Sequence, residues 1–300
     1  MKELSPIVLF VYNRIWHIEQ TINALKKNDQ AIKSDLFIFS DNAADESERK
    51  AVDSVRDFIK TVDGFKSVNI NEWQTNKGLA DSVITGVTEV IREYKKVIVL
   101  EDDIVCSKSF LSYMNKLLSF YQLNPKIFSV TGYTFPITIP DDYKYDVYPA
   151  PRASSWGWGT WIERWANVDW EVKDFEEFIE NKEAVNKFNM GGKDLIRMLK
   201  NQINGKINSW AIRWTYAHFK NGAYCIYPTK SRLKNIGADK SGTHTNKTKR
   251  YDVQIFEDKE KLKLFDNLVV DKRIILNFRK FFSQNKFMKL FEYLMGTFGK

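Results

Sequence analysis

The chain has 300 residues, a length that fits about two average domains or one large α/β unit with a smaller appendage. Hydrophobic residues make up 43% and charged residues 28%, with 14 glycines and 7 prolines, which excludes collagen-like and low-complexity disordered proteins. The formal net charge of +8 is concentrated in two basic stretches, 228–250 and 271–300, and this favours anionic partners.

The first 135 residues alternate between strand and helix patterns. In chain order they are a strand over 7–12, a helix over 17–25, a strand over 36–39, a helix over 45–61, a strand over 68–72, a helix over 80–94, a strand over 97–100, a helix over 107–121 and a strand over 128–131. This alternation predicts an α/β fold with a mostly parallel sheet flanked by helices on both faces.

The pattern changes from residue 136 onward. An irregular proline-containing connection over 136–151 leads to a Trp-rich segment over 154–170. A mostly polar helical stretch over 175–200, a further helix over 209–219, a basic Gly/Ser-rich loop over 231–250 and a basic amphipathic helix over 274–298 follow. We therefore expect three regions, 1–135, 136–250 and 251–300. The two cysteines, Cys106 and Cys225, offer no disulfide framework, which indicates a reducing compartment.

The sharpest feature is the acidic run Glu101-Asp102-Asp103, which directly follows the apolar strand over 97–100. Ligands of parallel sheets bind at the carboxyl ends of the strands, so these carboxylates point to the ligand edge. Carboxylate oxygens on a short turn suit Mg²⁺ or Mn²⁺. The alternative is a solvated acidic turn.

The triplet resembles the DxD-type metal motif of GT-A glycosyltransferases. LEDDIVCSKSFLSYM is similar to a segment of the N-acetylglucosaminyltransferase I family, and 7–14 and 76–80 with Gly86 resemble segments of family-2 glycosyltransferases. The resemblance covers 5–135 and is patchier over 150–250, where Trp156–Trp161 and Asn235–His244 look like parts of bacterial polysaccharide glycosyltransferases. It implies a GT-A, Rossmann-like fold, a nucleoside-diphosphate-sugar donor bound by 1–135, and an acceptor-side region over 136–250.

The resemblance also implies roles for the polar residues at the ends of the strands. Asp103 would hold the metal, Asp102 would lie near the ribose or a metal-bound water, and Glu101 would support both. Three further residues, whose alternative is ordinary loop polarity, would hold the base and ribose: Asn13, Arg14 and Asp41.

Two further segments are expected at the donor. Asn76, Lys77 and Gly78 precede a helix, and free amides at a helix N-terminus attract anions, although a simple cap with a turn glycine explains them too. In the basic loop, Lys240 would close over a diphosphate and His244 would reach the metal or phosphate; the alternative is a basic surface loop.

The Trp-rich segment is expected to contact the acceptor, because indole faces stack on sugars and the intervening glycines allow close approach. The alternative is a Trp-stabilised core. The expected acceptor-binding residues are Trp156, Trp158, Trp161, Trp210 and Arg213.

The catalytic base is not marked clearly. The resembling family carries its acid where this chain has Asn208 and Ser209. An inverting transferase needs a carboxylate that accepts the acceptor proton, so Asp194 is the first candidate and Asp239 the second. Asp194 could equally be a helix N-terminal carboxylate, and a retaining mechanism stays open.

The segment over 274–298 has one broad apolar face surrounded by lysine and arginine, as in helices that lie on an anionic membrane surface. The alternative is a helix packed on the catalytic domain. We expect a cytoplasmic protein that associates with the inner face of the cell membrane and binds no nucleic acid.

Together these features predict a metal-dependent glycosyltransferase that moves a sugar, with a UDP-sugar favoured as donor, to a glycan or lipid-linked acceptor in surface polysaccharide synthesis. One alternative is a sugar nucleotidyltransferase, but the Gly-rich loop expected after its first strand is missing at 13–17. Another is a non-catalytic carbohydrate- or membrane-binding protein, which leaves the acidic triplet unexplained.

Overall fold

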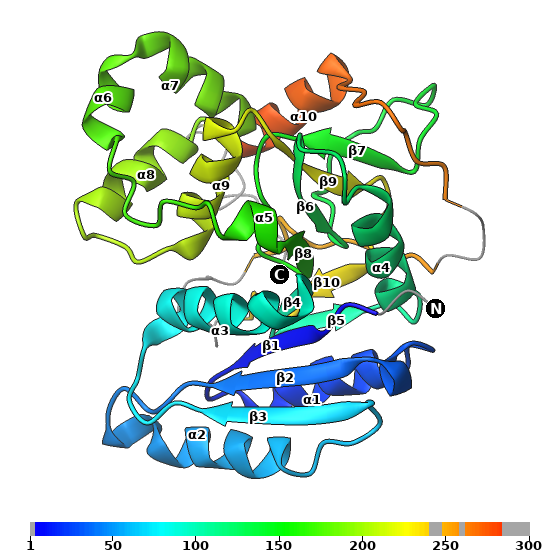
Figure 1. The fold of residues 1–300 in the computed structure, drawn as a ribbon, viewed down its shortest axis with the longest axis vertical. Coiled ribbons are helices and arrows are strands. Elements are labelled where there is room, and N and C mark those ends of the chain that lie inside the picture. The colour runs from blue at the N-terminus through cyan, green and yellow to red at the C-terminus, as the bar shows by residue number, and fades with distance from the viewer. Residues whose placement is uncertain (1–3, 240–247, 258–261, 284–300) are drawn as a thin grey trace, which may run out of the picture.

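An eight-stranded sheet with the order β3-β2-β1-β4-β8-β6-β9-β7 forms the centre of the computed structural model, and a second sheet pairs β10 with β5 (Figure 1). The structure describes residues 4–239, 248–257 and 262–283. The strands are β1 Ile7–Val11, β2 Asp35–Ser40, β3 Ser67–Glu72, β4 Lys96–Glu101, β5 Ile104–Cys106, β6 Ile127–Thr131, β7 Val147–Ala150, β8 Trp158–Trp161, β9 Tyr224–Pro228 and β10 Leu233–Asn235.

Helices cover both faces of the large sheet, as expected. The helices are α1 Ile15–Lys26, α2 Glu46–Ile59, α3 Gly78–Tyr94, α4 Phe110–Phe120, α5 Ile162–Trp165, α6 Phe175–Glu180, α7 Lys182–Phe188, α8 Leu195–Ile203, α9 Trp210–Lys220 and α10 Lys272–Phe282, with 3₁₀ turns η1 Ala31–Lys33 and η2 Asn189–Gly191. The α/β class with a mostly parallel, helix-flanked sheet is thereby confirmed.

The alternation of side chains along β1 explains the two cores. Ile7, Leu9 and Val11 pack with α1, α2 and α4 on one face, whereas Val8 and Phe10 pack with α3 on the other. All five side chains are buried, as expected for a strand covered on both sides. The strands β3, β2, β1 and β4 are parallel to one another, so their carboxyl ends lie at one edge.

The strands of the second half were not predicted. The strand β8 lies between β4 and β6 and is antiparallel to both. The glycine at position 159 allows β8 to approach β4 closely, because an added Cβ there would lie 2.8 Å from the Val97 carbonyl oxygen. The large sheet therefore continues across residue 135, and the expected regions 1–135 and 136–250 share it.

Two smaller cores lie outside the sheet layers. One joins α6, α7, α8 and α9 into a helical lobe, seen at the upper left of Figure 1. The other packs α10 against β7 and β9 through Ile274 and Phe278, which are 1% and 0% exposed. Over 272–282 this helix is therefore packed on the rest of the protein, which is the alternative to a membrane-surface helix. The rest of the predicted membrane-surface helix, 284–298, lies outside the described residues. Among the helices that the structure describes, none is both long and apolar enough to cross a membrane.

Candidate active site

The acidic turn lies at the point where the order of the sheet strands reverses. From β1 the chain builds β2 and β3 on one side and then returns to place β4 on the other side of β1. The carboxyl ends of β1 and β4 are adjacent, with Phe10 opposite Glu101. Such a switch point is where open α/β sheets bind their ligands. Asp102 and Asp103 follow β4 there, and Arg14 follows β1.

Arg14 joins the two strand ends by an ion pair with both aspartates. Its Nη2 contacts Asp102 Oδ1 and donates to Asp103 Oδ2 at 2.8 Å, while its Nε donates to Asp102 Oδ2 at 3.4 Å. The side chains of Asp102 and Asp103 are nearly buried, and that of Arg14 is 16% exposed. The pair is therefore held largely away from water, where charge interactions are strong.

Burial and mutual repulsion disturb the titration of this cluster. Burial raises the pKa of Asp102 to about 6, although Arg14 opposes the shift. Burial also raises the pKa of Glu101 well above its usual range, and the charges of Asp103 and Asp102 add to the effect. Burial alone would lower the pKa of Arg14, but the two aspartates outweigh it and raise that pKa. Perturbed pKa values such as those of Glu101 and Asp102 cluster at functional sites.

The segment after β10 covers the acidic turn. Asn235 Nδ2 donates to Asp103 Oδ1 at 2.8 Å, and the Ile236 amide donates to the Asp103 carbonyl at 2.8 Å. Gly237 lies so close that a Cβ there would be 2.1 Å from Asp103 Oδ2, which explains the glycine. From below, Thr21 Oγ1 donates to the buried Asp102 carbonyl at 2.6 Å. The turn is therefore fixed on both sides.

His17 links the start of α1 to the same covering segment. Its Nε2 lies 3.2 Å from Asp239 Oδ2, and the Asp239 side chain is 45% exposed. Burial and the nearby Arg14 lower the pKa of His17, which favours the neutral ring. The adjacent indole of Trp16 packs edge-on against His17 and is 54% exposed. A carboxylate and an aromatic face are therefore both accessible close to the acidic turn.

Asp41 caps α3 in place of an external anion. Its Oδ1 accepts from the Lys77 amide at 2.9 Å and its Oδ2 from the Gly78 amide at 2.8 Å. These are two of the amides expected to face an anion, so the simple-cap alternative describes them better in this structure. Asn76 Nδ2 donates to the Asn42 carbonyl at 2.6 Å. The segment 76–78 is thus fastened to the end of β2.

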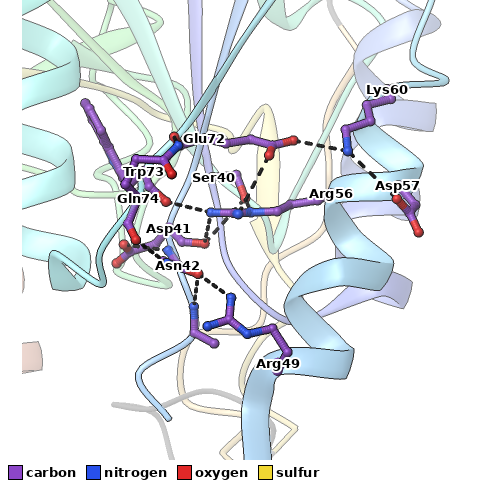
Figure 2. A network of polar contacts seen from close by, with 11 residues as sticks. Ser40, Asp41, Asn42, Arg49, Arg56, Asp57, Lys60, Glu72, Trp73 and Gln74 are labelled. Carbon is purple, nitrogen blue, oxygen red and sulfur yellow. Dashed lines mark hydrogen bonds and ion pairs between the residues drawn. The ribbon is translucent and has the colours of Figure 1, made fainter. Parts of the chain in front are cut away.

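Figure 2 shows the polar network that holds this edge of the sheet. Arg56 of α2 donates from Nη2 to the Trp73 carbonyl at 2.8 Å and pairs with Glu72 at 3.7 Å. Asn13, the remaining residue expected at the nucleotide, donates to Glu48 Oε1 of α2 at 3.1 Å. The ends of β1, β2 and β3 are therefore connected to α2 by hydrogen bonds.

The donor set at the turn fits a divalent cation in part. When Glu101, Asp102 and Asp103 are all ionised, Arg14 offsets only one of the three charges. Mg²⁺ is often bound by one or two carboxylates together with substrate phosphates and water. Across residues 4–239, 248–257 and 262–283, no three His, Cys, Asp or Glu side chains form a group able to hold a metal ion. Among the residues predicted to hold the metal, the structure describes Asp102 and Asp103, which remain candidates; His244 lies outside the described residues, as does Lys240, the predicted phosphate contact.

Most of the indoles expected at the acceptor are core residues. Trp158, Trp161 and Trp210 are at most 3% exposed, and Trp158 stacks on Trp210 with ring centroids 5.0 Å apart. These three side chains are closed off by their neighbours, so the expectation of acceptor contact is corrected to a core role. Trp156 is half-buried against Tyr133 and Tyr251, so acceptor contact stays a prediction for this residue.

Two polar acceptor-side predictions lie in structural contacts. Arg213 donates to the Trp170 carbonyl at 3.2 Å and to Asn208 Oδ1 at 2.8 Å. Asp194 forms a two-oxygen ion pair with Arg152 at 2.9 and 3.0 Å and lies at the start of α8. Its carboxylate pairs with the Arg152 guanidinium. Its position before α8 agrees with the alternative that Asp194 is a carboxylate at a helix N-terminus.

Sequence reasoning missed some of the residues around the turn. Thr21 and His17 are separated from it by more than 80 positions and carry no local signal. Trp16 could have been noticed as an indole next to a charged strand end. Asn235 was noticed only within a resembling segment, and its hydrogen bond to Asp103 depends on pairing β10 with β5.

Searches of family models and of curated proteins find no match to the chain. Solved structures do match. TarS from S. aureus is 13% identical with a TM-score of 0.42, over 76% of this chain and 36% of that one. The mannosyltransferase PcManGT from Pyrobaculum calidifontis, in complex with GDP-Man and Mn²⁺, is 13% identical with a TM-score of 0.37, over 56% of this chain and 48% of that one. The chain thus spans less than half of the length of either protein.

Proposed function

We propose that this protein is a metal-dependent glycosyltransferase that uses a nucleoside-diphosphate sugar. The observation that carries the proposal is the position of Asp102 and Asp103 at the switch point between β1 and β4, next to Arg14. A cation bound there, Mn²⁺ or Mg²⁺, would offset the charge of the leaving diphosphate. A UDP-sugar is the favoured donor, and Asn13, Lys77 and Lys240 are proposed to contact it.

The residues that surround the turn are proposed to position the donor. Thr21 and Asn235 orient the two aspartates. Because Gly237 has no side chain, the covering segment can lie directly against the Asp103 carboxylate. Arg14 supplies a guanidinium of the kind that binds phosphates through two hydrogen bonds. Preorganised charge that stabilises the transition state is commonly the largest single contribution that an enzyme makes to catalysis.

We propose Asp239 as the base that accepts the proton of the acceptor hydroxyl, in preference to Asp194. His17 holds Asp239 in the segment that covers the acidic turn, and the carboxylate is accessible from solvent. Arg152, in contrast, occupies both oxygens of Asp194. The exposed indole of Trp16 and the half-buried Trp156 are proposed to contact the sugar of the acceptor, a glycan or a lipid-linked saccharide of a surface polysaccharide.

A donor screen tests the function. The protein is incubated with UDP-, GDP- and dTDP-sugars and Mn²⁺, and the released nucleoside diphosphate is measured with and without added acceptor. Asp103→Asn should lower release by about 100-fold or more because it removes a charge from the donor site. Glu72→Gln, a strand-end carboxylate in the network of Figure 2, is the matched control. Pyrophosphate release from a nucleoside triphosphate and a sugar 1-phosphate would indicate a nucleotidyltransferase instead.

A further inference from the structure

The four carboxylate oxygens of Asp102 and Asp103 all accept hydrogen bonds from this chain. Arg14 contacts both oxygens of Asp102 and Oδ2 of Asp103, and Asn235 donates to the remaining Asp103 oxygen at 2.8 Å. A cation that binds these aspartates therefore meets positions that a guanidinium already fills. Two positive groups cannot share them without repulsion.

We propose that Arg14 is a displaceable counter-ion that competes with the divalent cation for Asp102 and Asp103, and that cation binding releases its guanidinium toward the phosphates of the donor. The inference rests on the cation site of the proposed function. It makes Arg14 a positioning residue whose orientation depends on whether the site holds a cation.

The contacts of Arg14 suit an exchangeable group. Within the described part of the chain, its side-chain hydrogen bonds go to Asp102 and Asp103 alone. Its side chain is 16% exposed, so it has a route to solvent. A divalent ion brings two positive charges to the carboxylates of the turn, whereas the guanidinium brings one. Exchange therefore relieves repulsion among the carboxylates and frees the Arg14 guanidinium to turn toward the phosphates of the donor.

Arg56 is a natural control for this exchange. It is also a largely buried arginine at the same edge of the sheet and also pairs with a strand-end carboxylate, that of Glu72. Unlike Arg14, it donates to backbone carbonyls as well, including that of Trp73 at 2.8 Å. Those bonds do not depend on a cation, so Arg56 should stay in place when a cation binds.

The test measures binding of Mn²⁺ alone, without nucleotide, to the wild type, Arg14→Met and Arg56→Met by calorimetry. Removing the competitor should tighten Mn²⁺ binding by at least about threefold in Arg14→Met, whereas Arg56→Met should match the wild type. A smaller change in Arg14→Met, weaker binding, or no Mn²⁺ binding by any form would overturn the proposal.

A second measurement on the wild type avoids any folding defect of the variant. An arginine-specific dicarbonyl reagent is added with and without Mn²⁺, and modification of each arginine is followed by peptide mass spectrometry. Mn²⁺ should speed modification of Arg14 and leave Arg56 unchanged; an unchanged or slower rate at Arg14 contradicts the exchange. Both readouts are independent of sugar transfer. Competition without any transferase activity would keep this inference and remove the proposed function, while activity without competition would do the reverse.

Discussion

The carboxylate of Asp103 accepts a hydrogen bond of 2.8 Å from the side-chain amide of Asn235, a residue 132 positions later in the chain. The bond connects the turn after β4 to the end of β10. The pairing of β10 with β5, in which Asn235 lies opposite Ile104, brings the two side chains together. The acidic site is therefore assembled from both halves of the chain, and residues 1–135 alone do not complete it.

The cap formed by Asp41 should make it important for stability. Asp41→Ala removes the acceptor of the Lys77 and Gly78 amides, so the free energy of unfolding should fall by about 2 kcal/mol. Urea denaturation measures the loss. Asp45→Ala, which removes the exposed cap of α2, is the control and should cost less. An equal or larger loss in the control would show that Asp41 is free for another role.

The two classes of indole should respond differently to truncation. Trp158→Ala removes a fully buried side chain and should lower the free energy of unfolding by about 3–5 kcal/mol. Trp16→Ala removes an exposed side chain and should leave stability nearly unchanged while raising the KM for the acceptor. Thermal melts and acceptor titrations check both. A stable Trp158→Ala protein with a raised KM would restore the acceptor role of that indole.

A buried histidine should give the fold a dependence on acid. His218 Nδ1 donates to the Trp214 carbonyl and Nε2 accepts from Ser129 Oγ, each at 2.8 Å, and burial lowers its pKa to about 4. The unfolded chain therefore takes up a proton near pH 6.5 that the folded chain rejects until about pH 4. Stability should be fully present above pH 6.5 and be lost progressively as the pH falls toward 4.

Urea denaturation at pH 5 and pH 7 measures this effect, with His218→Gln as the comparison. The difference in stability between the two pH values should shrink in the variant, because glutamine takes up no proton in that range. An equal difference in both proteins would mean that other groups cause the acid sensitivity.

Two truncations separate packing from membrane binding in the C-terminal region. Deleting 272–300 removes α10 and uncovers Tyr148 and Tyr227, so the melting temperature should fall by several degrees or the protein should aggregate. Deleting 284–300 keeps α10 and should leave the fold intact. If the predicted membrane surface lies in 284–300, only the intact protein should float with anionic vesicles, and the binding should weaken with salt. Equal flotation of the shorter protein would exclude that role.

The first half of the fold could be predicted because β1, β2 and β4 are largely buried, mostly apolar runs that alternate with helices. The strand β8 could not, since its indoles and glycines are also typical of a sugar-binding loop. The strand is favoured by the close packing of Gly159 on β4, where an added Cβ would lie 2.8 Å from the Val97 carbonyl oxygen, and this packing depends on the tertiary structure.

The acidic site shows the same division. Its position after β4 follows from local pattern, and so does the location of Arg14 after β1. The direct pairing of Arg14 with both aspartates does not, because it requires knowing that β1 and β4 are neighbours. Asp41 was recognised as a strand-end carboxylate, but its partners in 76–78 lie across the edge of the sheet and leave no mark in the sequence around it.

The most direct test of the central claim is calorimetry of UDP binding in Mn²⁺ and in EDTA, for the wild type and Asp103→Asn. The account predicts that Mn²⁺ tightens UDP binding to the wild type by about tenfold or more and that this dependence disappears in the variant, while both proteins melt at similar temperatures. UDP binding that is equally strong in EDTA, or a Mn²⁺ dependence that survives Asp103→Asn, would contradict the assignment of this turn as the donor and metal site.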